Sequence, residues 1–103
     1  MRIFQKKGYS VAVAARGGEA IEKLNRNNFD VALIDFCLPD MEGTKLFPMI
    51  EHNSPRTLKI MWSGKIVEPQ HIAGADALLG KPIHPDKLLS IIESKLKNRN
   101  IEL

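Results

Sequence analysis

The sequence has a single cysteine, Cys37, so no disulfide can form within the chain. One cysteine is typical of a protein that works in a reducing compartment, and we expect a cytoplasmic location. No run of about 18 apolar residues is present, and no signal-peptide pattern opens the chain. We therefore expect neither a membrane-spanning nor a secreted protein.

A clustered basic face is also lacking. The net charge is +3, but Lys and Arg are spread along the chain instead of gathering in one stretch. Direct binding to nucleic acid needs a basic patch or stripe, so we do not expect it. What is present is enough apolar material, 44% of 103 residues, for one domain with a buried core.

The segment 31–43 carries the most information. Val31 to Ile34 form a continuous apolar run, which is typical of a strand buried on both faces of a parallel sheet. Asp35 stands where this run stops, and Pro39 and Gly43 follow in the next loop. Ligand sites of open parallel sheets form at the carboxyl ends of the strands. Asp35 is therefore either a site residue or an aspartate that closes a strand with a turn.

The remaining pattern alternates strands with helices. Residues 1–7 resemble the last turns of a helix, with Gly8 as a left-handed cap. Strands are predicted at 9–15, 29–38, 58–63 and 77–79, with a break at Gly17 and Gly18 after the first. Helices are predicted at 19–27, after Gly43, as a short element near Pro69, and from Pro85 onward. Pro48 predicts a late start or a kink in the second of these helices. This order favours an α/β fold with a parallel sheet, right-handed crossovers and helices on both faces.

Three predicted strand ends carry polar side chains: Asp35, Ser63 and Lys81. In a parallel sheet they would meet at one edge, where a carboxylate can act as nucleophile and the other two groups can bind phosphoryl oxygens. Taken singly, a serine there is usually a turn former and a lysine before proline is usually on the surface.

The three histidines, His52, His71 and His84, are scattered and are expected to be solvated. No metal-ligand cluster, nucleophile–base pair or Gly-rich phosphate loop indicates an independent enzyme.

These residues also carry a family resemblance. The matching positions are Leu33-Ile34-Asp35 with Pro39, Met41, Glu42 and Gly43; Ser63; Gly74-Ala75-Asp76; Lys81-Pro82; and, earlier, Gly8-Tyr9 and Gly18-Glu19-Ala20. The sequence resembles the receiver domain of two-component response regulators, of the chemotaxis-regulator type. The resemblance covers essentially the whole chain and implies a flavodoxin-like three-layer sandwich with a mostly parallel sheet. It also implies a phosphoprotein that acts in a phosphorelay of cytoplasmic signal transduction and is not an enzyme.

The resemblance assigns roles to individual residues. Asp35 would accept a phosphoryl group from a histidine kinase or phosphotransfer protein, while Ser63 and Lys81 would contact the phosphoryl oxygens. The Lys81–Pro82 peptide bond would be cis. Asp35 and the backbone carbonyl of Cys37 would be magnesium ligands. A downstream protein partner would receive the signal.

The sequence departs from the family at its start. The first strand, which ends in an acidic pair that binds magnesium, is absent, and residues 1–7 correspond to a remnant of the first helix. The magnesium site is therefore expected to be incomplete. Loss of a strand also leaves sheet edges exposed. The second strand could move next to the central one, two chains could associate, or the sequence could be a fragment. We favour a shortened receiver that forms a homo-oligomer, with one domain over 1–103 and a short tail at 98–103.

Further departures lie near the end of the chain. The segment between Ser63 and Lys81 is shortened, and Leu78 occupies a position where the family often has an aromatic residue. Two functions therefore remain open. One is a receiver that is phosphorylated on Asp35. The other is a degenerate receiver that acts as a protein-interaction or dimerisation module without phosphorylation.

Overall fold

The computed structural model describes residues 2–64 and 74–101. The chain divides into two compact units, one formed by Val13–Lys81 and the other by Met1–Ala12 together with Pro82–Leu103. The short helix predicted near Pro69 lies outside the described residues.

The larger unit is built on a three-stranded sheet. The strands are β1 (Val31–Asp35), β2 (Leu58–Ser63) and β3 (Ala77–Gly80), in the order β1-β2-β3, and both neighbouring pairs are parallel. The register places Asp35 beside Trp62 and Ser63 beside Gly80. The predicted parallel sheet is confirmed, and the bounds predicted for β2 are those observed.

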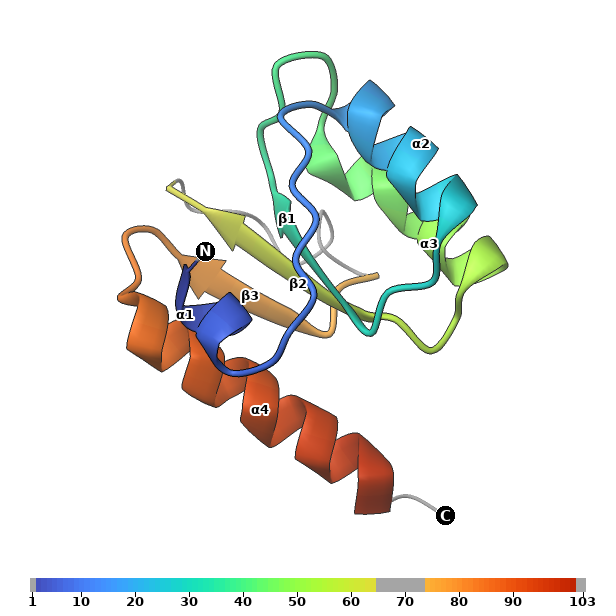
Figure 1. Cartoon of the computed structure of the whole chain (residues 1–103). Coiled ribbons are helices and arrows are strands. Elements are labelled where there is room, and N and C mark those ends of the chain that lie inside the picture. Colours follow the sequence, from blue (N-terminus) through green and yellow to red (C-terminus); the bar gives the residue numbers. More distant parts are fainter. Residues whose placement is uncertain (1, 65–73, 102–103) are drawn as a thin grey trace. The chain divides into compact units, whose positions relative to one another are not determined.

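Helices α2 (Gly17–Arg26) and α3 (Phe47–Asn53) lie on the same face of this sheet (Figure 1). Between β1 and α3 the chain forms a short 3₁₀ helix, η1 (Gly43–Leu46). Pro48 stands in the first turn of α3, where its missing N–H costs no helical hydrogen bond, so the predicted late start is confirmed. Gly17 and Gly18 form the first turn of α2, and do not precede it as the sequence had indicated.

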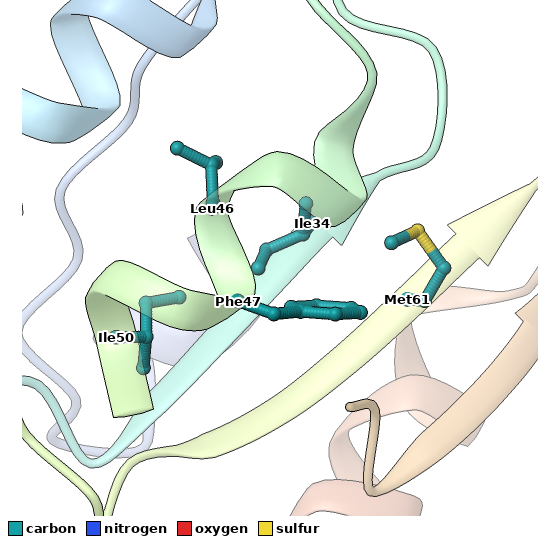
Figure 2. Close-up of a cluster of buried hydrophobic side chains, with 5 residues drawn as sticks. All are labelled: Ile34, Leu46, Phe47, Ile50 and Met61. Atoms are coloured by element: carbon teal, nitrogen blue, oxygen red, sulfur yellow. The ribbon is translucent and has the colours of Figure 1, made fainter. Parts of the chain in front are cut away.

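The core of this unit joins the helices to the sheet. Figure 2 shows its five buried side chains, which come from β1, η1, α3 and β2: Ile34, Leu46, Phe47, Ile50 and Met61. Apolar side chains of α2, including Ile21 and Leu24, pack against this cluster. On β2, Leu58 and Ile60 alternate with Met61 and so point to the opposite face of the sheet, where they are also buried. The core therefore fixes the strand ends that carry the candidate site.

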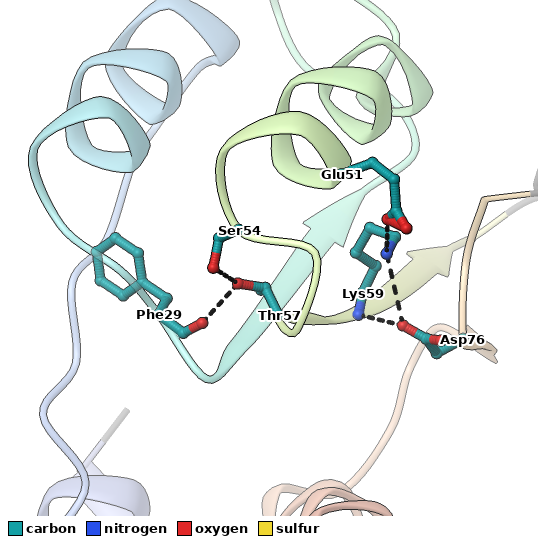
Figure 3. Close-up of polar contacts among 6 residues, drawn as sticks. All are labelled: Phe29, Glu51, Ser54, Thr57, Lys59 and Asp76. Atoms are coloured by element: carbon teal, nitrogen blue, oxygen red, sulfur yellow. Dashed lines mark hydrogen bonds and ion pairs between the residues drawn. The ribbon is translucent and has the colours of Figure 1, made fainter. Parts of the chain in front are cut away.

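Polar contacts hold the opposite end of the sheet (Figure 3). The buried Thr57 hydroxyl donates to the Phe29 carbonyl at 2.6 Å and lies 2.8 Å from the Ser54 hydroxyl. Lys59, also buried, reaches Glu51 and Asp76 with its ammonium group. These contacts tie the start of β2 to α3 and to the segment before β3.

The smaller unit contains α1 (Arg2–Lys6) and α4 (Pro85–Ile101), which contact each other. Gly8 has φ +93°, and the N–H groups of Gly8 and Tyr9 donate to the carbonyls of Gln5 and Phe4, so the predicted left-handed cap is confirmed. Helix α4 begins at the predicted Pro85. It continues through Ile101, into the segment 98–103 predicted as a tail, because no Gly or Pro interrupts it.

Two strand predictions were wrong. The segment 9–15 forms no strand, although its Val and Ala content favours one, because a strand needs a partner for its backbone hydrogen bonds. The predicted central strand at 29–38 is β1, which lies at an edge of the described sheet. Of its five residues only Ile34 is buried, so burial on both faces was not realised.

Candidate functional site

Asp35, Ser63 and Lys81 meet at the edge of the sheet that is formed by the carboxyl ends of its strands, as the parallel arrangement predicts. Asp35 ends β1, Ser63 ends β2, and Lys81 directly follows β3. The Lys81 ammonium forms an ion pair with Asp35 Oδ2. The backbone N–H of Lys81 donates to the Ser63 carbonyl oxygen at 2.8 Å, which extends the pairing of β2 and β3 to the site.

The Asp35 carboxylate is held on both sides and is still accessible. Its Oδ1 accepts a hydrogen bond from the backbone N–H of Cys37 at 3.1 Å, while Oδ2 faces Lys81. The side chains of Asp35 and Lys81 are 32% and 34% exposed, so a phosphoryl donor can approach this carboxylate from solvent. Ser63 is buried beside them. The Asp35 carboxylate can act as nucleophile toward a phosphoryl group, and the Lys81 ammonium beside it can neutralise the charge of that group.

Trp62 is a site residue that the sequence reasoning missed. The Lys81 ammonium lies 5.0 Å from the centroid of the Trp62 ring, within the range of a cation–π interaction. The indole therefore helps to hold the ammonium near Asp35. The signal in the sequence was the position of Trp62 directly before Ser63, a predicted strand end, but the register that sets it beside Asp35 is a tertiary feature.

The loop after Asp35 folds back on itself. The Gly43 N–H donates to the Phe36 carbonyl at 2.8 Å, and the Leu38 N–H donates to the Met41 carbonyl at 3.0 Å. A Cβ on Gly43 would overlap the Asp35 carbonyl oxygen and the Ile34 side chain. Glycine at this position therefore allows the loop to close against the end of β1.

Asp40, at the tip of this loop, binds the first turn of α2. Its two carboxylate oxygens accept hydrogen bonds from the N–H groups of Gly17, at 2.7 Å, and Gly18, at 2.9 Å. The hydrogen bonds from Gly18 and Gly17 lower the pKa of Asp40 below its ordinary value, and the charge of Arg16 acts in the same direction. Asp40 was not predicted to have this role, because its partners lie more than 20 residues earlier in the chain.

The residues at this edge do not make a complete magnesium site. Asp35 and the Cys37 carbonyl are two oxygen donors, whereas magnesium takes about six, usually with one or two carboxylates among them. Asp40 has both oxygens on α2, and the Glu42 carboxylate accepts a hydrogen bond from the Thr44 hydroxyl at 2.8 Å. Within residues 2–64 and 74–101, no group of three or more His, Cys, Asp or Glu side chains is placed to hold a metal ion.

Two of the three histidines, and Leu78, belong to the described part of the chain. His52 is exposed in the last turn of α3, and His84 is exposed beside Asp86 before α4 begins. His71 lies outside the described residues. Leu78, on β3, is 41% exposed, and is one of two large apolar side chains so exposed in the described part of the chain. None of the helices described here is long and apolar enough to cross a membrane.

Residues 1–93 match the family model of the response regulator receiver domain. Among curated proteins, the response regulator receiver protein CpdR of Brucella abortus is 32% identical over 101 residues, which are 93% of this chain and 83% of CpdR. The transcriptional regulatory protein GlrR of Escherichia coli is 30% identical over 95 residues, 88% of this chain, but the match spans only 21% of GlrR. Among solved structures, a CheY-like response regulator receiver domain from Methanospirillum hungatei superposes with a TM-score of 0.89 at 38% identity. That match covers 99% of this chain and 85% of the other.

These similarities establish the fold class as flavodoxin-like α/β, in agreement with the parallel sheet. Receiver domains are signalling modules of two-component systems, in which phosphorylation on an aspartate is general. They typically bind Mg²⁺ and interact with histidine kinases or phosphotransfer proteins. The match spans nearly the whole chain and includes the edge at which Asp35, Ser63 and Lys81 meet, so the chain belongs to the response regulator receiver domain family.

Proposed function

We propose that this chain is a two-component receiver that accepts a phosphoryl group on Asp35 from a histidine kinase or phosphotransfer protein. The observation that carries the proposal is the ion pair between the half-exposed side chains of Asp35 and Lys81. It lies at the carboxyl ends of the strands, where β2 ends in the buried Ser63. We further propose that residues 1–103 act as a single receiver domain, whose signal passes to a downstream protein partner.

The transfer is a displacement at phosphorus. A carboxylate oxygen of Asp35 attacks the phosphorus of a phosphohistidine, the P–N bond breaks, and a P–O bond to Asp35 forms. The histidine leaves with the electron pair of the broken bond and takes up a proton. The product is an acyl phosphate, and the chain is changed only at Asp35.

Lys81 and Ser63 have separate roles in this proposal. The Lys81 ammonium moves from the Asp35 carboxylate to a phosphoryl oxygen, and so neutralises charge where it develops. The Ser63 hydroxyl donates to another phosphoryl oxygen. We propose a cis Lys81–Pro82 peptide bond at this point of the chain. Asp35 and the Cys37 carbonyl remain the proposed metal ligands, as part of an incomplete site, and no step of the transfer is assigned to a metal.

Acetyl phosphate tests the proposal without a cognate kinase. The protein is incubated with acetyl phosphate, with and without Mg²⁺, and intact mass is followed over time. We expect wild type to gain one phosphoryl group and Asp35→Asn to gain none. Asp30→Asn is the matched control, since Asp30 is an exposed aspartate that directly precedes β1, at the opposite end of the strand from Asp35. Lys81→Ala should gain the group more slowly. An unmodified wild type that is fully folded contradicts the proposal.

A second candidate is a degenerate receiver that serves as an interaction or dimerisation module. It is favoured by the incomplete metal site and by the outer side of β1, because β1 pairs with β2 alone among the described strands. An exposed edge is a template for another chain, so we propose homo-oligomerisation through it. Light scattering at several concentrations tests this, with Leu33→Pro as the variant that removes an N–H from the side of β1 that does not face β2. A monomer at every concentration contradicts self-association.

The proposed function implies where the protein acts and which surfaces it does not bind. We propose that the protein acts in the cytoplasm, where its kinase partner would present the phosphohistidine, without direct contact to nucleic acid or membrane. The spread of Lys and Arg along the sequence supports the first of these exclusions. A change in the electrophoretic mobility of duplex DNA caused by the protein at physiological ionic strength, and weakened by added salt, would contradict it.

A further inference from the structure

Helix α2 lacks a cap of its own. Arg16 occupies the N-cap position with extended backbone angles, φ −155° and ψ 167°, but makes no capping hydrogen bond with its side chain. A guanidinium group has only donors, so it cannot accept from the free N–H groups of the first turn. Asp40 accepts from two of them, those of Gly17 and Gly18, with one carboxylate oxygen each. The cap of α2 therefore comes from another part of the chain.

Asp40 belongs to a loop whose two arms pair through their backbones. Three pairings close the loop in succession: Phe36 with Gly43, Cys37 with Glu42 as an antiparallel bridge, and Leu38 with Met41. Pro39 and Asp40 form the two residues at the tip, and proline restricts the backbone there. Such a ladder transmits a constraint from the tip to the base, where Cys37 follows Asp35 by two residues.

The contact between the loop tip and α2 is tight. Gly17 is buried, and a Cβ at this position would overlap the Met41 side chain. At Gly18 a Cβ would lie 3.6 Å from Asp40 Oδ2, which is an ordinary contact distance. The absent side chain at Gly17 thus lets Met41 and Asp40 approach the first turn of α2 together. The loop is held by packing and by two hydrogen bonds to a charged acceptor, which are stronger than neutral ones.

We infer that Asp40 is a positioning residue for Asp35: by capping α2 it holds the loop that presents the Cys37 N–H to the Asp35 carboxylate. The Cys37 N–H donates to Asp35 Oδ1 at 3.1 Å, so its place decides how the carboxylate is oriented toward Lys81. The kinetic consequence rests on the proposed function, whereas the geometric one does not. In this role Asp40 keeps both oxygens on α2 and is not a substitute metal ligand.

Four variants separate positioning from simple stabilisation of α2. Asp40→Ala removes the cap, and Asp40→Asn leaves one oxygen acceptor. Asp40→Ala combined with Arg16→Ser restores a local cap to α2, because the backbone at 16 already has the extended geometry that a capping serine needs. Glu22→Gln is the control, since it removes one exposed negative charge from the same helix. Three quantities are measured for each: the melting temperature, the amide NMR resonance of Cys37, and the rate of modification by acetyl phosphate.

We expect Asp40→Ala to lower the melting temperature, to shift the Cys37 amide resonance and to slow modification about tenfold or more, since small misplacements of reacting groups have large effects. Asp40→Asn should fall between it and wild type. The Arg16→Ser combination should recover the melting temperature and leave the resonance and the rate altered. Recovery of all three quantities, or an unshifted Cys37 resonance in Asp40→Ala, would overturn the inference. If wild type is not modified at all, the proposed function fails, and the Cys37 resonance still tests the position of the loop.

Discussion

Replacing Lys59 by methionine should leave the protein at least as stable as wild type, although it removes a buried charge from β2. The Lys59 side chain is 7% exposed, and its ammonium lies 2.9 Å from Glu51 Oε2 and 3.9 Å from Asp76 Oδ2 (Figure 3). These two partners are 59% and 44% exposed. Removing the ammonium therefore leaves both carboxylates hydrated.

The size of the expected change in unfolding free energy follows from two opposing contributions, the desolvation of the Lys59 ammonium and its ion pairs. Burying an ammonium costs several kcal/mol even after relaxation of the protein, and pairs with half-exposed carboxylates return only about 0–1 kcal/mol each. Methionine has a similar length and gains from burial in the same space. The backbone N–H of Lys59 donates to Asp76 at 2.7 Å, and this bond does not depend on the side chain. We expect the free energy of unfolding to rise by about 1 kcal/mol in Lys59→Met, and to fall by about 2–4 kcal/mol in Lys59→Ala, which leaves a cavity.

Urea unfolding followed by far-UV circular dichroism measures both changes at neutral pH. A repeat in 1 M salt, where the Debye length is about 3 Å, weakens the ion pairs of wild type and should widen the advantage of Lys59→Met. A loss of more than about 2 kcal/mol in Lys59→Met would refute the reasoning, because it would mean that the ion pairs outweigh desolvation.

Four further predictions concern single positions. Gly43→Ala should lower the free energy of unfolding by about 3 kcal/mol, since its Cβ would overlap the Asp35 backbone, and a change under about 1 kcal/mol in urea unfolding would count against that packing. Gly8→Ala should cost about 1–2 kcal/mol, because φ is +93° and no other group crowds the site, and an unchanged melting curve would speak against the left-handed cap. The lowered pKa of Asp40 contributes stability above the ordinary Asp pKa of 3.8, and this contribution is lost as pH falls through the lower pKa of the folded state, so Asp40→Asn should flatten the acid limb of a melting-temperature profile. Trp62 is the only tryptophan, and its emission should change when beryllofluoride draws Lys81 away from the ring, whereas Lys81→Ala should show no such change.

Local signals predicted several parts of the fold correctly. The apolar residues 60–62, Pro48, Pro85 and Gly8 each act within a few residues, and the structure has the strand, the helix starts and the cap that they predict. The prediction for 9–15 was wrong because strand formation depends on a partner that may lie anywhere in the chain. The status of β1 as an edge depends in the same way on which strands are present beside it.

The candidate site was likewise predicted only in part from the sequence. Asp35 and Lys81 come together because parallel strands end at one edge, and strand ends are readable from sequence. Asp40 and Trp62 were missed because their partners are set by tertiary packing. Asp40 binds amides of α2 from a loop more than 20 residues later, and no periodicity or spacing in the sequence signals such a contact.

The central claim is that Asp35 is the residue that becomes phosphorylated. The most direct measurement is to treat the protein with acetyl phosphate, to reduce the acyl phosphate with borohydride, and to map the resulting homoserine by peptide mass spectrometry. We predict homoserine at position 35 in wild type and none in Asp35→Asn. Homoserine at another aspartate, or at no position in a folded and acetyl phosphate-treated protein, would contradict the account.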